Sequence, residues 1–126
     1  MRLVVLIDDD RDDAELFKEV LSEIDPSILF QHFELSGEAL KVLLEAKKDL
    51  PDFIFLDINM PVVSGWQCLT EFKHSEHLKN TPVIMFTTSS QPEEKERAKK
   101  LGADGFITKP NGYLALKDLL VSFLSK

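Results

Sequence analysis

The stretch Phe53–Pro61, with the sequence FIFLDINMP, constrains the fold of this chain more than any other part of it. Its first four residues are large and apolar without alternation, a pattern typical of a strand buried on both faces. Such strands belong to parallel sheets covered by helices on both sides, so the pattern predicts an α/β fold. Asp57 ends this strand, and ligands bind at the carboxyl ends of strands in open α/β sheets. Asp57 could instead cap the following turn, a common role for aspartate.

Composition limits the kind of protein that this sequence can encode. With 126 residues, of which 44% are apolar, the chain fits one globular domain, expected to cover residues 1–126. No apolar run approaches the length needed to span a bilayer. Cys68 is the only cysteine, which excludes an internal disulfide and favours a reducing, cytoplasmic setting. The net charge of −7 argues against nucleic-acid binding, so we expect neither a nucleic-acid nor a membrane partner.

Short apolar runs alternate with amphipathic stretches along the whole chain. The uninterrupted runs Leu3–Ile7, Phe53–Leu56 and Val83–Phe86 predict three central strands, whereas the mixed or shorter runs 28–33 and 105–108 predict two edge strands. Five helices are expected between and after them. Ser36 is expected to cap the second, and Ser90 with Glu93 has capping-box spacing for the fourth. The fourth helix is mostly polar and should lie exposed.

This alternation predicts a flavodoxin-like, doubly wound five-stranded parallel sheet of order 2-1-3-4-5 with five helices. The switch point of such a sheet lies between the first and third strands. Asp8 and Asp57 end those two strands, so their side chains should meet in one crevice.

The residues expected in this crevice predict a chemistry. A cluster of Asp8, Asp9 and Asp57 is costly unless a cation neutralises it. An all-oxygen site without cysteine or histidine suits Mg²⁺, for which Mn²⁺ could substitute, better than zinc. Thr87 and Lys109 end the fourth and fifth strands beside it. Metal, hydroxyl and ammonium around one carboxylate would hold a phosphoryl group, with Asp57 as the nucleophile that forms an acyl phosphate.

With these motifs in place, the chain resembles the receiver domain of bacterial response regulators over essentially its whole length. The resemblance rests on Asp8-Asp9, Asp57, Met60-Pro61 with Gly65, Thr87, and Lys109-Pro110, each at its strand end. It implies a CheY-like, phosphorylation-dependent signalling switch in which Asp57 accepts a phosphoryl group from a histidine kinase or phosphotransfer protein.

 It further implies that Asp9 and Asp57 bind Mg²⁺ directly, that the backbone carbonyl of Asn59 is a third ligand, and that Asp8 acts through water. Thr87 and Lys109 would contact the phosphoryl oxygens, and the Lys109–Pro110 peptide bond would be cis.

Three positions depart from the usual pattern of this family. Ser64 stands where an aspartate is frequent, and Thr88 replaces the small residue that commonly follows the switch threonine, which would narrow the path of a hydrolytic water. Phe106 occupies the aromatic switch position that is often a tyrosine. The resemblance implies that Thr87 and Phe106 carry the signal to the face made by the fourth helix, last strand and last helix. An output protein or a second copy of the chain would bind there, and the only catalysis expected is the chain's own phosphorylation and dephosphorylation.

Two other functions fit parts of the sequence. Asp8 and Asp10 after a buried strand are similar to the nucleophile motif of haloacid-dehalogenase-type phosphatases, in which Asp8 would carry the phosphoryl group, but no acidic pair follows a late strand. A receiver-like docking module that never accepts phosphate is the third interpretation. Among the remaining polar residues, His32 is expected to be an ordinary strand residue, and His74 and His77 to be solvated. Asp12 and Asp13 are expected only to stabilise a helix N-terminus.

Overall fold

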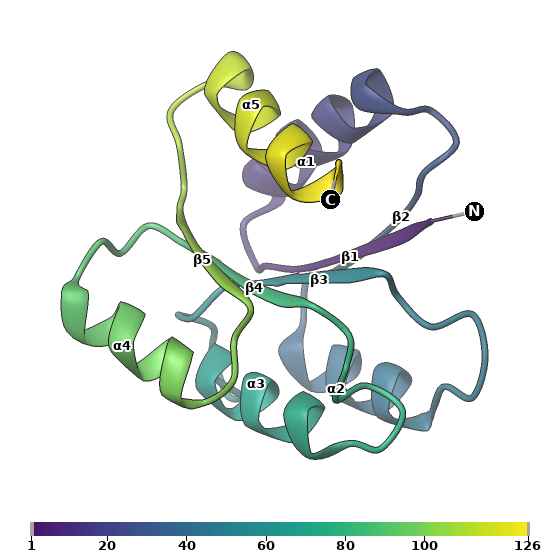
Figure 1. Ribbon diagram of the computed structural model, residues 1–126, viewed down its shortest axis with the longest axis vertical. Coiled ribbons are helices and arrows are strands. Elements are labelled where there is room, and N and C mark those ends of the chain that lie inside the picture. The colour runs from purple at the N-terminus through teal and green to yellow at the C-terminus, as the bar shows by residue number, and fades with distance from the viewer. Residues whose placement is uncertain (1, 126) are drawn as a thin grey trace.

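The computed structural model describes residues 2–125, in which strands and helices alternate strictly along the chain (Figure 1). The strands are β1 (Leu3–Ile7), β2 (Leu29–Phe33), β3 (Phe53–Leu56), β4 (Val83–Thr87) and β5 (Gly105–Thr108). The helices are α1 (Arg11–Ile24), α2 (Ser36–Glu45), α3 (Gly65–His74), α4 (Pro92–Lys100) and α5 (Tyr113–Leu124). Among the described residues, no helix is both long and apolar enough to cross a membrane.

The strands form one parallel sheet of order β2-β1-β3-β4-β5, which confirms the predicted order. Helices α1 and α5 cover one face of the sheet, and α2, α3 and α4 lie on the other (Figure 1). The wholly apolar strands are central, and every residue of β4 is buried. Strand β2 is an edge strand, and its Leu29 is 53% exposed. The degree of apolarity of each run therefore predicted its place in the sheet.

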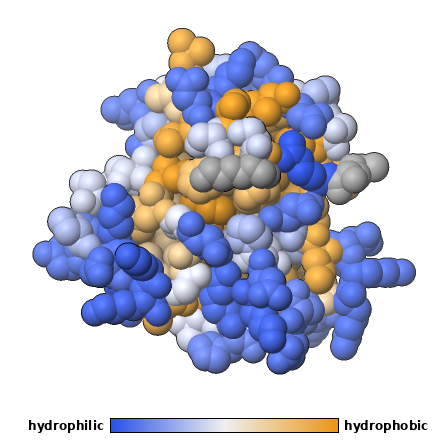
Figure 2. Space-filling model, in the orientation of Figure 1, coloured by the Kyte–Doolittle hydropathy of each residue, from blue (hydrophilic) through white to orange (hydrophobic). Residues whose placement is uncertain are grey.

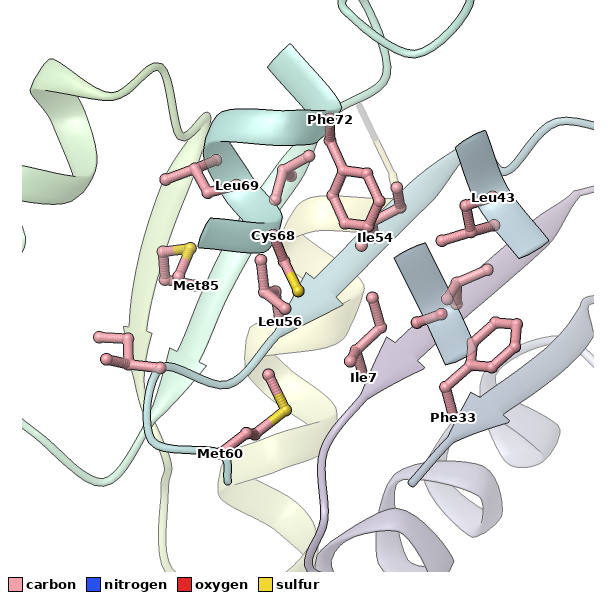
Figure 3. Packing of buried hydrophobic residues seen from close by; sticks show 14 of the residues in the cluster. Ile7, Phe33, Leu43, Ile54, Leu56, Met60, Cys68, Leu69, Phe72 and Met85 are labelled. Carbon is pink, nitrogen blue, oxygen red and sulfur yellow. The ribbon is translucent and has the colours of Figure 1, made fainter. Parts of the chain in front are cut away.

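Each face of the sheet has its own apolar core. On one face, Leu69 and Phe72 of α3 lie against Ile54 and Leu56 of β3, as Figure 3 shows. On the other, the ring of Phe17 in α1 packs edge-on against Phe55 and Phe86, with ring centroids 5.1 and 5.5 Å apart. Because both faces of the central strands are packed, their carboxyl ends are held in fixed positions.

Cys68 belongs to the core of the α3 face and is a free thiol. Burial raises the pKa of this thiol to about 12, with a further contribution from Glu71. A thiol that stays protonated is a poor nucleophile, so Cys68 is a packing residue.

The two serine caps predicted from the sequence are wrong. Ser36 is the first residue of α2 instead of its cap, and its buried hydroxyl donates to the carbonyl of Val63, 2.6 Å away. That carbonyl lies in the loop after β3, so a tertiary hydrogen bond replaces the local one. At the start of α4 the cap is Gln91, without a side-chain hydrogen bond, and Ser89 donates to Glu94 instead. The hydroxyl of Ser89 also accepts the N–H of Gln91.

Helix α4 is exposed, as its polar sequence predicted. Ala98 is its one buried residue. The surface over this helix, on the left in the orientation of Figure 1, is largely hydrophilic in Figure 2. Gly102 follows the helix with a φ of 99°, a left-handed conformation that suits glycine at the end of a helix. Helix α4 is thus attached to the domain by few apolar contacts.

Candidate functional site

Asp8 and Asp57 lie side by side because β1 and β3 are parallel and paired with Ile7 opposite Leu56. The pairing continues past the strands, since the N–H of Asp57 donates to the carbonyl of Ile7 over 3.0 Å. Both side chains are buried, with Asp8 fully enclosed and Asp57 7% exposed. The parallel register alone therefore brings two carboxylates together at the switch point of the sheet, as predicted.

Asp9 completes a cluster of three carboxylates. One oxygen from each of Asp8, Asp9 and Asp57 lies within 4.8 Å of the others, and Asp9 is exposed, so the cluster opens to solvent on its side. Oδ1 of Asp8 accepts the N–H of Asp10, whereas Oδ2 of Asp8 is buried without a hydrogen-bond donor in the part of the chain that the structure describes. Three carboxylate oxygens this close together fit a hard divalent cation.

Burial changes the acidity of the two enclosed carboxyls. Desolvation raises the pKa of Asp8 to about 6, although Lys109 and the N–H of Asp10 act in the opposite direction. The pKa of Asp57 is also raised by burial, against the charge of Lys109. Ionised carboxylates in this position are therefore costly in the metal-free protein.

Lys109, which follows β5, reaches into the cluster. Its Nζ lies 2.8 Å from Oδ2 of both Asp8 and Asp13 and 3.6 Å from Oδ2 of Asp57. With Asp13 it forms a hydrogen bond, whereas its contact with Asp8 is an ion pair without hydrogen-bond geometry. Burial alone would lower the pKa of Lys109, but the hydrogen bond to Asp13 and the nearby negative charge of Asp8 outweigh burial and raise this pKa. The lysine is therefore held as an ammonium between the carboxylates.

Asp13 is the site residue that the sequence analysis missed, because we assigned it only to the N-terminus of a helix. It does lie in the first turn of α1, where its N–H donates to the capping side chain of Asp10. Its carboxylate nevertheless points to Lys109. The spacing contained a signal: Asp13 precedes the buried Phe17 by four residues, which places both on the same side of the helix.

Thr87 ends β4, and its side chain is fully buried. The N–H of Lys109 donates to its carbonyl over 2.6 Å, which ties the ends of β4 and β5 together. Thr88 and Asn59, in the loops after β4 and β3, are exposed. The end of β4 and the two loops therefore place one buried and two exposed polar residues at the carboxyl edge of the sheet.

Phe106 lies on β5 opposite Met85 of β4 and is half-buried against the core. It lines a groove between α4 and β5 together with Lys99 and Ala103. Phe106 therefore lies between the core next to β4 and the exposed helix α4.

The Lys109–Pro110 peptide bond is trans, since no described peptide bond is cis, and the predicted cis-proline at Pro110 is wrong. The sequence offered only the proline for that prediction, and proline itself still favours trans by about 0.5–1 kcal/mol. Lys109 reaches the carboxylates from the trans backbone.

Gly65 begins α3 where this helix meets the backbone of Asp57 and Ile58. Its N–H donates to the carbonyl of Ile58 over 2.9 Å. A Cβ at this position would lie 2.1 Å from the carbonyl oxygen of Asp57. Glycine is required here because the helix and the backbone of Asp57 are in contact.

The three histidines contact backbone carbonyls. Nε2 of His32 lies 2.7 Å from the carbonyl oxygen of Asp8, so this strand residue supports the loop that carries the acidic pair. Ring nitrogens of His74 and His77 lie 2.7 and 3.1 Å from the carbonyl oxygens of Thr70 and Leu43. His74 is exposed, as predicted, whereas His77 is half-buried and contacts the carbonyl of Leu43 in α2, so it is less solvated than the sequence predicted.

Comparison with known proteins identifies the family. The model of the response regulator receiver domain matches residues 4–120. The chain is 35% identical to the chemotaxis protein CheY of Halobacterium salinarum, over 79% of this chain and 80% of that protein. It is 30% identical to the response regulator Rcp1 of Synechocystis, over 94% of this chain and 81% of that protein.

Solved structures and longer relatives complete this comparison. The crystal structure of the phosphorylated cyanobacterial phytochrome response regulator RcpA superimposes with a TM-score of 0.89 at 25% identity, covering 98% of this chain and 94% of that one. The chain spans only 24% and 8% of the length of two longer curated relatives that it matches. Together with the strand order and the aspartates at the strand ends, these matches show that the chain belongs to the family of response regulator receiver domains, the phosphorylation-dependent switches of two-component signalling.

Proposed function

We propose that Asp57 accepts a phosphoryl group from a histidine kinase or phosphotransfer protein, and that this chain thereby acts as a signalling switch in the cytoplasm. The observation that carries the proposal is the convergence of Asp57 with Asp8, Asp9 and Lys109 at the carboxyl edge of the sheet. An enclosed carboxylate beside an ammonium and a cation-sized cluster of oxygens is suited to phosphoryl transfer.

The cluster is proposed to hold Mg²⁺, with Mn²⁺ as a substitute. Asp9 and Asp57 would be direct ligands together with the backbone carbonyl of Asn59, and Asp8 would act through water. When bound, the cation supplies positive charge to the oxygens of the transferred phosphoryl group. Since Asp9 and Asn59 are exposed, water can fill the remaining positions, which suits the incomplete protein shell of magnesium sites.

In the transfer step, a carboxylate oxygen of Asp57 attacks the phosphorus while the bond from phosphorus to the donor nitrogen breaks, leaving that nitrogen with its electron pair. Lys109 donates to a peripheral oxygen of the new acyl phosphate, and so does the hydroxyl of Thr87. Thr88 lies exposed beside Thr87, where its methyl and hydroxyl groups narrow the approach of hydrolytic water and lengthen the life of the acyl phosphate.

The signal is proposed to leave the site through Thr87 and Phe106. When Thr87 moves toward the phosphoryl group, it vacates volume behind it that Phe106 fills from β5, and α4 shifts in response. The face made by α4, β5 and α5 would then bind an output protein or a second copy of the chain.

Intact mass spectrometry tests the assignment of Asp57. Incubation with acetyl phosphate and Mg²⁺ should add one phosphoryl group to the protein. The Asp57→Asn variant should fold but should not be modified. The Asp118→Asn variant, changed at an exposed position of α5, should still be modified. A phosphoryl group on Asp8 would favour the phosphatase interpretation, and no modification of any residue would favour the docking module.

A further inference from the structure

We infer that Asp13 is a positioning residue: its hydrogen bond keeps Lys109 away from Asp57 and so lowers the affinity of the site for a phosphoryl group. The inference rests on the proposed function, because it concerns how Lys109 serves that group. The inference is drawn from the position of Lys109, whose ammonium lies among three carboxylates: Asp13 in α1, Asp8 just after β1, and Asp57 just after β3.

The distances show which carboxylates direct the ammonium. Nζ of Lys109 lies 2.8 Å from Asp13 and from Asp8, but 3.6 Å from Asp57. Only the contact with Asp13 has the geometry of a hydrogen bond from the lysine. The resting ammonium therefore lies closer to Asp13 and Asp8 than to the carboxylate that would carry the phosphoryl group, and it donates its hydrogen bond to Asp13.

Asp13 differs from the other partners of Lys109 in its surroundings. It lies outside the cluster of Asp8, Asp9 and Asp57, and its side chain is 35% exposed. Helix α1 fixes its position, since the N–H of Asp13 donates to Asp10. The carboxylate of Asp13 thus competes for Lys109 from a rigid element without belonging to the metal-binding cluster.

A phosphoryl group on Asp57 would draw Lys109 toward its oxygens. Since Nζ lies 3.6 Å from Oδ2 of Asp57, the ammonium must move to donate to them, and we expect this movement to lengthen its hydrogen bond to Asp13. Removing the carboxylate of Asp13 removes this competition, so a phosphoryl mimic should bind more tightly. A partly exposed charge-assisted hydrogen bond is worth about 1 kcal/mol, which corresponds to about fivefold in affinity.

Beryllofluoride, a mimic of the phosphoryl group, provides the probe. Its affinity in the presence of Mg²⁺ should rise about fivefold in Asp13→Asn, by isothermal titration calorimetry. Asp12→Asn is the matched control, since it removes the same charge from the same turn of α1 at an exposed position, and its affinity should stay near that of the wild type. Both variants should fold, because Asp13 contributes its backbone N–H to the cap.

A double-mutant cycle separates a specific role from a general effect of charge. In a Lys109→Gln background, Asp13→Asn should leave the affinity for beryllofluoride unchanged, because no ammonium remains to be held back. Equal affinities of Asp13→Asn and Asp12→Asn, a weaker affinity of Asp13→Asn, or the same gain in the Lys109→Gln background would each overturn the inference. If the wild type binds beryllofluoride, those results leave the proposed function standing; if the wild type does not bind it, both fail.

Discussion

Gly65 is the residue at which the fold leaves no room for a side chain. In Gly65→Ala the new Cβ would meet the carbonyl oxygen of Asp57 at 2.1 Å, a backbone atom that cannot move without displacing the strand end. We expect a loss of about 2–3 kcal/mol in the free energy of unfolding, measured in urea. The control is Gly37→Ala in α2, where the nearest atom to a new Cβ is a side-chain carbon of Val63 at 3.9 Å. An equal effect of the two substitutions would show that helix propensity, and not crowding at Asp57, decides the outcome.

Asp8 should make the metal-free protein less stable as the pH rises. Its pKa is raised from 3.8 to about 6 in the folded state, mainly by burial, so the folded protein binds this proton more tightly than the unfolded chain does. The loss of stability caused by burying ionised Asp8 is absent below about pH 4, grows between about pH 4 and pH 6, and is complete above that range. Because one pKa unit is worth about 1.4 kcal/mol, the full penalty is about 3 kcal/mol.

Urea unfolding in EDTA between pH 4 and pH 7.5 measures this penalty. Other groups titrate over the same range, so the quantity of interest is the difference in unfolding free energy between the wild type and Asp8→Asn. That difference should grow in favour of Asp8→Asn as the pH rises. A difference that stays constant would mean that Asp8 is not the carboxyl with the raised pKa.

Among single residues, the sequence predicted the positions of those that directly follow the strands. Asp57, Asp8 and Lys109 could be placed because the end of a buried strand fixes where the next side chain lies. Asp13 could not, since its role depends on the distance between the first turn of α1 and the end of β5, two elements far apart in sequence. The isomer of the Lys109–Pro110 bond depends on tertiary context in the same way.

Among the elements, α4 should respond most to phosphorylation. Only Ala98 anchors it in the core, whereas Thr87 at the end of β4 is fully buried beside the site. Beryllofluoride with Mg²⁺ should change the hydrogen exchange of α4 and β5 in the wild type. Thr87→Ala should still be phosphorylated on Asp57, yet it should lose this change because no hydroxyl is left to move.

Thr70→Ala provides the control for this prediction. It removes a hydroxyl that donates to the carbonyl of Trp66 in the same helix, α3, so the response of α4 should persist. A normal response of α4 in Thr87→Ala would show that the signal takes another route out of the site.

The existence of each element was easier to predict than the details of its ends. The polar sequence of α4 predicted its exposure, because a helix without an apolar stripe has no face to bury. The caps at Ser36 and Ser90 were mispredicted, since serine hydroxyls also bond to distant groups. The hydroxyl of Ser36 donates to Val63, in a loop that a local pattern cannot place.

At the scale of the whole molecule, a metal that binds only the folded chain should raise its stability. The carboxylates of Asp8, Asp9 and Asp57 come together only when β1 and β3 pair. The free energy of unfolding should therefore rise with Mg²⁺ concentration, by about 2.7 kcal/mol at one hundred times the dissociation constant. Asp9→Asn should lose most of this rise, as thermal unfolding at several Mg²⁺ concentrations can measure.

Asp12→Asn serves as the control for the metal as well, because it lowers the negative charge of the same region without touching the cluster. Its stabilisation by Mg²⁺ should match that of the wild type. Undiminished stabilisation in Asp9→Asn would show that Asp9 is not a ligand.

The topology of the whole molecule was predicted because three wholly apolar runs had to occupy the centre of the sheet and two mixed runs its edges. Right-handed crossovers then left few ways to connect them. The packing of α1 against α5, and of α3 against β3, could not be predicted, since it depends on side-chain shapes that sequence periodicity does not describe.

The sparse anchoring of α4 has a consequence for how receivers of this kind diverge. Since Ala98 is the one buried residue of this helix, substitutions elsewhere on it remove almost no core packing and leave stability nearly unchanged. Mutations can therefore accumulate there without the loss of folded protein that limits change in β3 or β4. A duplicated gene could acquire a new partner through α4 while its phosphorylation chemistry, fixed by the buried strand ends, stayed the same.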